Sequence, residues 1–155
     1  MFNRDWDRAT SQFHKAAEMD PGVPLPHENL GIVLEETGRH GQAIDQYLTA
    51  WTAAGENAEV VKLLRETYAA FGLVGFWQKQ LEIALSRWNQ WHADAFRIAS
   101  FYPRLVQDEL AIDWLERGFE ARSGAIVWIK LYPWFGRLAQ HPRFREMSRQ
   151  IGLPE

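Results

Sequence analysis

The sequence predicts an all-α protein in which helix pairs stack side by side as a solenoid. Three observations predict this fold: small and large apolar residues recur every 34 residues, apolar residues within each segment follow helical spacing, and glycines stand where helix pairs must turn. The chain has 155 residues and no cysteine, so its core must form without disulfides. A chain of this length buries roughly 68–70 % of its unfolded surface, which suits one domain over residues 1–155.

The strongest repeat lies in the second helix of each expected helix pair. Four sets of residues are equivalent at steps of 34: Ala9, Phe13, Ala16 and Pro21; Ala43, Tyr47, Ala50 and Gly55; Trp77, Leu81, Ala84 and Asn89; Ala111, Leu115, Gly118 and Ser123. The first helix repeats as Leu30 and Leu34, then Leu64 and Tyr68, then Ile98 and Tyr102. Small residues allow two helix backbones to approach closely, and the large residue between them fills the space under the next helix.

The expected helices follow this pattern from the N-terminus. They cover residues 5–19, 26–37, 41–54, 58–71, 74–88, 92–102 and 108–121. Asp5 and Asp108 are suited to cap helix starts, while Gly38 and Gly72 are suited to end the first helices of two pairs. Pro103 should truncate the first helix of the last pair, because proline cannot donate to the helical hydrogen-bond ladder.

The 34-residue period and the small–large–small spacing resemble the tetratricopeptide repeat (TPR), a helix–turn–helix unit. The resemblance implies a right-handed superhelix. Its parts are a half repeat at 5–21, repeats at 24–55, 58–89 and 92–121, and a C-terminal cap at 122–155. Arg65 and Trp77 stand where the family has small residues, so we expect that helix pair to be splayed or shifted.

The C-terminal residues 122–155 depart from the 34-residue pattern. Residues 125–132 are mostly apolar, and we expect a short helix there because a lone strand would have no partner. Pro133 should stop this helix. Pro142 can open a final helix at its first turn, with Phe144, Met147 and Ile151 on one face.

The end of the chain also resembles a narrower group of sequences. The segments YPWFGRL, HPRF and IGLP look like the ending of TPR arrays in bacterial multidomain regulators, among them winged-helix transcriptional activators, class III nucleotide cyclases and signalling kinases. The sequence contains no glycine-rich phosphate loop and no kinase or cyclase motif. The resemblance therefore implies a sensing or docking module and no enzymatic activity.

Composition and motifs disfavour several classes of function. A formal net charge of −3 predicts no nucleic-acid partner, and the absence of an apolar run of about 18 residues predicts no membrane span. The charged N-terminal segment does not match a signal peptide, which together with the missing cysteines predicts a cytoplasmic protein. No two histidines show metal-ligand spacing, and no nucleophile–base set can be assembled. We expect no metal, no cofactor and no catalysis.

The family resemblance implies a concave groove lined by the first helices, where a protein or peptide would bind. The residues that the register carries into this groove are Glu28, Asn29, Ile32, Glu35, Glu59, Lys62, Leu63, Glu66, Phe96, Arg97 and Ser100. This face is mixed and somewhat acidic, so it favours a basic or amphipathic segment. The lysine–asparagine clamp that some family members use for a peptide carboxylate is not reproduced, because Glu66 takes the place of the asparagine beside Lys62.

The helix at 5–19 is expected to leave an apolar face uncovered, since it is the second half of a repeat whose first half is missing. Trp6 and Phe13 belong to this face, and an exposed apolar face invites association. A second copy could cover it, giving a homodimer, and an N-terminal extension in a longer parent protein could cover it equally well. The second functional hypothesis is a regulatory or sensor fragment of a bacterial signalling or transcription regulator.

Overall fold

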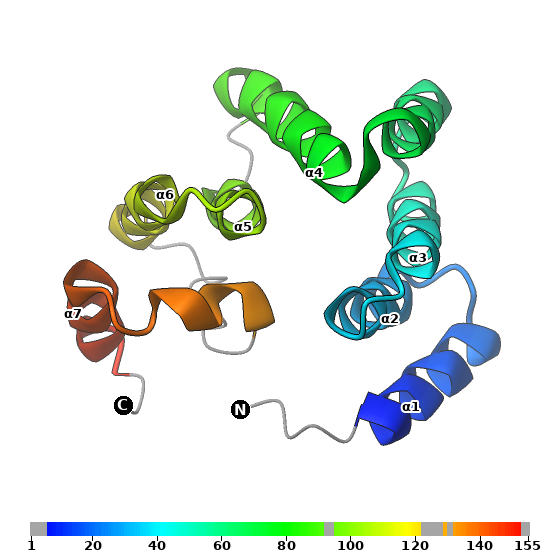
Figure 1. Ribbon diagram of the computed structural model, residues 1–155, viewed down its shortest axis with the longest axis horizontal. Helices are drawn as coiled ribbons and strands as arrows, with labels where there is room; N and C mark the ends of the chain where they lie inside the picture. Colours follow the sequence, from blue (N-terminus) through cyan, green and yellow to red (C-terminus); the bar gives the residue numbers. More distant parts are fainter. Residues whose placement is uncertain (1–5, 92–94, 122–128, 130–131, 153–155) are drawn as a thin grey trace. The chain divides into compact units, whose positions relative to one another are not determined.

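The computed structural model describes residues 6–91, 95–121, 129 and 132–152, and every regular element among them is helical. The elements are α1 Trp6–Met19, α2 Pro24–Glu36, α3 His40–Ala53, α4 Ala58–Trp91, α5 Ala95–Arg104, α6 Asp108–Glu120, the 3-10 helix η2 Pro133–Leu138, and α7 Pro142–Gln150 (Figure 1). No strand occurs in these ranges, so the all-α prediction is confirmed for them.

The chain divides into two compact units, with the boundary between Phe76 and Trp77 inside α4. The N-terminal unit holds α1, α2, α3 and the first part of α4, and the C-terminal unit holds the remainder. A repeat array makes contacts mainly between neighbouring repeats, so a division of this kind does not decide the number of domains. One domain over residues 1–155 therefore stays a prediction.

Helix starts and turns keep the 34-residue step. Helices α1, α3, α6 and α7 begin at residues 6, 40, 108 and 142, at intervals of 34 or twice 34. Gly72 has φ +68° and ψ −160°, which breaks α4 into the two predicted helices. Gly38 and Val106 stand 34 residues before and after it, with φ of +78° and +59°. A residue with positive φ thus follows each first helix, although only glycine adopts such a φ without strain.

The N-terminal unit packs α1 on α2 and α2 on α3 (Figure 1). The closest approach lies between α2 and α3, where a Cβ added at Gly31 would stand 2.6 Å from Cε1 of Tyr47. Tyr47 stacks on Trp51 at a centroid distance of 5.8 Å, and Trp51 stacks on Phe76 at the same distance. Leu64 of α4 is fully buried. Close helix contact therefore rests on a glycine and a tyrosine of one repeat.

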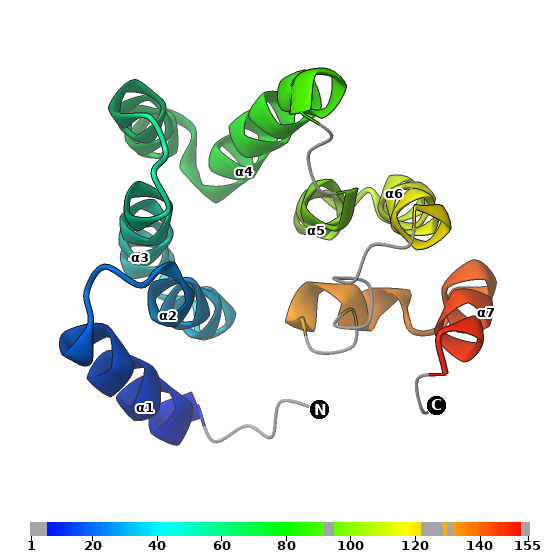
Figure 2. The same cartoon turned by 180° about the vertical axis from the view of Figure 1, so that it is seen from behind.

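The C-terminal unit packs α5 on α6, η2 on α5 and α7 on α6 (Figure 2). Trp77 is buried and its ring lies 5.8 Å from that of Phe101. Trp88 and Trp114 form an edge-to-face pair at 4.9 Å. Aromatic side chains from α4, α5 and α6 thus supply much of this core, since large rings bury more apolar area than any aliphatic residue.

Charged groups attach α7 to α6. The guanidinium of Arg143 bonds Asp113 at 2.7 Å and Glu116 at 2.5 Å, and it lies 3.4 Å from Glu109. His141 Nε2 also lies 2.8 Å from the Glu109 carboxylate. Hydrogen bonds to Glu116 and Asp113 raise the pKa of Arg143 further above its ordinary value. All these side chains are partly exposed, so they orient α7 more than they stabilise it.

The predicted helix bounds agree with the structure within a few residues, but two details were wrong. Gln107, without a side-chain bond, is the N-cap of α6, and Asp108 follows it in the first turn. Pro103 lies inside α5, which continues to Arg104. Pro133 opens η2, and most of the helix that it was expected to stop lies outside the described residues. At the start of η2 a proline needs no hydrogen-bond donor, whereas Pro103 removes one bond of the α5 ladder, which ends one residue later.

Other predictions for the chain ends have mixed outcomes. Pro142 opens α7 as predicted, Phe144 and Met147 are buried on one face, and Ile151 is half-buried. Gly152, with φ +77°, follows the helix end. The expected cap at Asp5 and most of the expected helix at 125–132 lie outside the described residues.

Candidate functional site

The α2 part of the predicted binding face is only partly accessible. Glu28 and Asn29 are half-buried, whereas Ile32 is buried at 6 % exposure. The Tyr47 hydroxyl donates a hydrogen bond of 2.7 Å to Oε2 of Glu35, which is half-buried. Ile32 therefore belongs to the core, and the Glu35 carboxylate already accepts a hydrogen bond within the chain.

The α4 part of the same face is open to solvent. Glu59, Lys62, Leu63 and Glu66 are all exposed. Lys62 Nζ lies 3.9 Å from Oε1 of Glu66, one helical turn on. Lys62 is thus already paired with a carboxylate of its own helix. Such exposed pairs contribute little to stability, so they can exchange for contacts with a partner.

Charge on this N-terminal set is mainly negative. Glu28, Glu35, Glu59 and Glu66 stand against the single cation of Lys62. Surface charges of one sign raise the local concentration and association rate of oppositely charged segments. The electrostatics of the set therefore favour a basic partner.

The α5 part of the predicted face differs. The ring of Phe96 lies 5.5 Å from that of Tyr132 and 5.5 Å from that of Phe135. Ser100 is buried and its hydroxyl donates to the Arg97 carbonyl at 2.6 Å. Of the three predicted residues, only Arg97 is exposed. The chain's own C-terminal segment covers this part of the predicted surface.

Arg104 holds the same C-terminal segment, a role that the sequence did not indicate. Its guanidinium lies 3.9 Å from the centroid of Trp77 and 3.5 Å from that of Trp134. One guanidinium N–H also donates to the Ser100 carbonyl at 3.2 Å. The only sequence signal was the cluster of aromatics in YPWF, which gives no partner by itself. A cation between two indole rings is a favourable arrangement, since ring faces attract positive charge.

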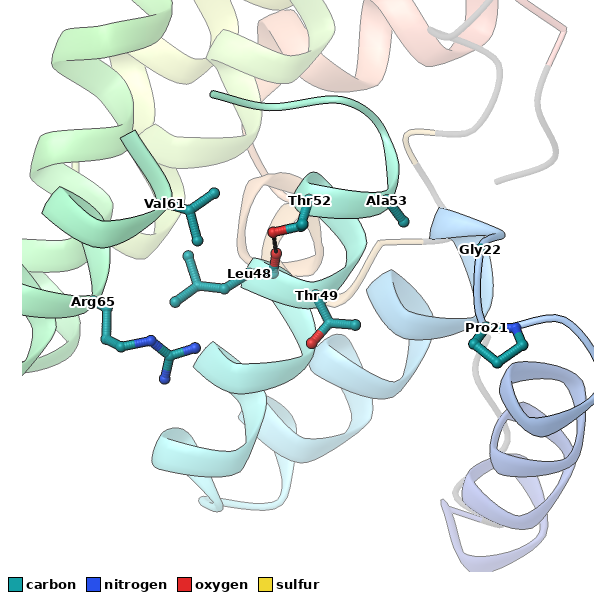
Figure 3. A pocket seen from close by; sticks show the side chains of 8 residues that line it. All are labelled: Pro21, Gly22, Leu48, Thr49, Thr52, Ala53, Val61 and Arg65. Atoms are coloured by element: carbon teal, nitrogen blue, oxygen red, sulfur yellow. Dashed lines mark hydrogen bonds between the residues drawn. The ribbon is translucent and has the colours of Figure 1, made fainter. Parts of the chain in front are cut away.

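The N-terminal unit also contains an open cleft of about 360 Å³. Pro21 and Gly22 of the α1–α2 turn, four α3 residues and two α4 residues form its lining. Figure 3 shows Leu48 of α3 and Val61 of α4 pointing toward one another across it. Arg65, at one end, bonds Asp45 at 2.6 Å. The cleft is mostly apolar and its one charged group is already paired, so it lacks the converging polar groups of a reaction site.

The predicted apolar face of α1 is partly covered. Trp6 and Phe13 are half-buried, and Ala17 is the buried residue of this helix. Met19, at the end of α1, is 85 % exposed. A homodimer through this helix stays a prediction.

The histidines lie at separate places in the described chain: His14 and His40 are exposed, His27 is buried and His141 is half-buried. Nδ1 of His27 lies 2.8 Å from Oε1 of Gln46. His92 lies outside the described residues. Among the residues that the structure covers, no three potential ligands of the His, Cys, Asp or Glu type converge on a point where a metal would fit. None of the helices in the same ranges has the length and apolarity that a membrane span needs.

Comparison of the chain with protein-family models, with curated proteins and with solved structures finds no match.

Proposed function

We propose that this chain is a protein- or peptide-binding module of the TPR type, with a C-terminal cap and without catalytic activity. Its repeats would stack as a right-handed superhelix whose first helices present one concave face. A partner segment would lie along the faces of α2 and the first part of α4. The missing cysteines suit a cytoplasmic site of action.

The recurrence of one helix-pair geometry at 34-residue steps carries this proposal. Equivalent first-helix residues Leu30, Leu64 and Ile98 are each buried to 1 % exposure or less. A residue with positive φ follows each of these helices, at Gly38, Gly72 and Val106. A 34-residue helix–turn–helix period is the TPR signature, and repeat arrays use extended concave surfaces for binding.

The partner that fits is a basic, amphipathic segment. The exposed carboxylates of Glu59 and Glu66 offer acceptors for lysine or arginine, and the exposed Leu63 on the same helix offers an apolar contact. An acidic C-terminal tail is disfavoured, because Lys62 already pairs with Glu66 and the set carries a net negative charge.

A peptide array tests this proposal. Immobilised basic amphipathic peptides and acidic peptides of equal length would be probed with the full chain and with a Glu59→Lys, Glu66→Lys variant. We expect the native chain to select basic peptides, and the variant to lose at least about tenfold in affinity, as charge pairs across an interface do.

The matched control carries the same change of charge on other exposed residues, Glu18→Lys and Glu120→Lys. This control should bind basic peptides nearly as the native chain does. Equal loss in both variants would mean that only net charge matters, and no selection of basic peptides at all would reject the proposed binding face.

A second candidate is a sensor fragment of a bacterial regulator, favoured by the YPWFGRL, HPRF and IGLP segments at the end of the chain. The gene's full reading frame and neighbourhood test it. An output domain or signalling genes would support this role, and their absence would count against it.

A further inference from the structure

We propose that the Phe96 side of α5 is a binding surface for a short aromatic segment followed by a cation, and that residues 132–137 of this chain occupy it. This inference depends on contacts inside the C-terminal unit alone. It stands even if the acidic set on α2 and α4 binds nothing.

The occupying segment is held through side chains. Tyr132 and Phe135 pack on Phe96, and Trp134 covers the Arg104 guanidinium. Arg137 Nε donates to Oδ2 of Asp108 at 2.9 Å. Aromatic and arginine anchors of this kind dominate the energetics of protein interfaces. The segment is therefore bound to α5 in the way that a peptide ligand would be.

The backbone of the segment adds little order of its own. Tyr132 is extended, with φ −92° and ψ 126°, and η2 begins at Pro133 without a side-chain cap. A 3-10 helix of six residues has poor hydrogen-bond geometry and is marginal in isolation. The order of this segment thus depends on the α5 surface that receives it.

The fit leaves two polar atoms unsatisfied. Nε1 of Trp134 and Oδ1 of Asp108 are buried, and neither has a hydrogen-bond partner among the described residues. A buried donor or acceptor without a partner is costly. A partner segment that also satisfies Asp108, for instance with a second donor from its arginine, would bind better than the chain's own segment does.

Covalent attachment gives the chain's own segment an effective concentration in the millimolar range, so a free peptide competes poorly with it. The test therefore weakens the attached segment first. Anisotropy of a labelled synthetic peptide of residues 132–137 would be measured with the native chain and with a Tyr132→Ala, Trp134→Ala variant. We expect the variant to bind the peptide at least about tenfold more tightly than the native chain does, since two aromatic contacts no longer compete.

Phe96→Ala added to this variant should abolish the gain, and Phe71→Ala in the native chain, a change of an exposed ring elsewhere, should leave peptide binding unaltered. Equal binding by native chain and variant, or a gain that survives Phe96→Ala, would overturn the proposal. If circular dichroism shows the double variant unfolded, Tyr132→Ala alone replaces it. The single change should still improve binding by about threefold, and no improvement would again reject the surface.

Discussion

The α2–α3 and α5–α6 pairs stand two steps of 34 residues apart, yet their equivalent buried positions hold different side chains. In the first pair the ring of Tyr47 fills the space that a side chain at residue 31 would need. In the second pair the equivalent residues are Ala99 and Leu115, both fully buried. One pair combines glycine with tyrosine and the other alanine with leucine. The equivalent positions stay buried while their residues change.

The turns of the two pairs also place different residues at equivalent positions. Gly38 adopts φ +78° without a steric penalty, whereas Val106 adopts φ +59° with a branched side chain that is 68 % exposed. Left-handed backbone costs a residue with a Cβ roughly 1–2 kcal/mol. The second pair therefore carries strain that the first avoids. Backbone hydrogen bonds from Val106 N to the Pro103 carbonyl at 3.1 Å and from Gln107 N to the Tyr102 carbonyl at 2.9 Å close this turn.

The largest expected effect is a difference in the loss of unfolding free energy between a change in an interior helix, α6, and the equivalent change in the first helix, α1. Leu115→Ala should lower the free energy of unfolding by about 3–4 kcal/mol, because it opens a cavity at a fully buried site. The equivalent change in α1, Phe13→Ala, should cost only about 1–2 kcal/mol since Phe13 is half-buried. Urea unfolding of both variants checks this order, and equal losses would show that α1 packs as tightly as α6.

The next largest effect tests whether the small residue at position 31 and the large residue at position 47 are matched in volume. Gly31→Val should destabilise by about 2–3 kcal/mol through overpacking against Tyr47. Ala99→Gly, the opposite change in the second pair, should also destabilise, by about 1 kcal/mol. Gly31→Ala combined with Tyr47→Leu should be less destabilised than the sum of the single changes. If the losses of unfolding free energy in that double-mutant cycle are additive, the two residues are not matched in volume.

A smaller effect tests the turns. Val106→Gly should raise the free energy of unfolding by about 1 kcal/mol, and Gly38→Val should lower it by about 1–2 kcal/mol. Thermal melts of the two variants provide the measurement. A destabilised Val106→Gly variant would mean that the valine side chain makes contacts worth more than the strain.

The smallest effect concerns the attachment of α7. Arg143→Gln removes exposed charge pairs to Asp113 and Glu116, so the melting temperature should fall slightly at low salt. This difference should shrink at high salt, because exposed charges are screened. Phe144→Ala, which removes a buried ring from the same helix, should destabilise at every salt concentration and serves as the control.

The sequence alone predicted the helices well, α7 included, but it did not predict the place of α7 in the 34-residue period. Periodic apolar residues and turn glycines are local signals, and they located the helix pairs around Gly38 and Gly72. Residues 122–155 were expected to depart from the period, but α7 begins 34 residues after α6. Helix α7 starts at the 34-residue interval, but its side chains do not repeat the small–large–small residues of the earlier helices. A search for repeated residues therefore could not show that α7 belongs to the same period.

The predicted binding face shows the same limit of prediction from repeated residues. Alignment at the 34-residue step predicted that Ile32 and Phe96 lie on the surface, because the equivalent positions of the TPR family lie there. The structure buries Ile32 against its own core and covers Phe96 with Tyr132 and Phe135. Contacts between segments far apart in the chain leave no periodic signal, which is why Arg104 between two tryptophans was also missed.

An experimental structure that relates successive helix pairs by a single screw operation would test the central claim most directly. The operation that carries residues 24–53 onto 58–87 should, when applied again, carry the chain onto 92–121. A stacked array of this kind is the predicted result. Helix pairs that close into a bundle, or that need unrelated operations at each step, would contradict the account.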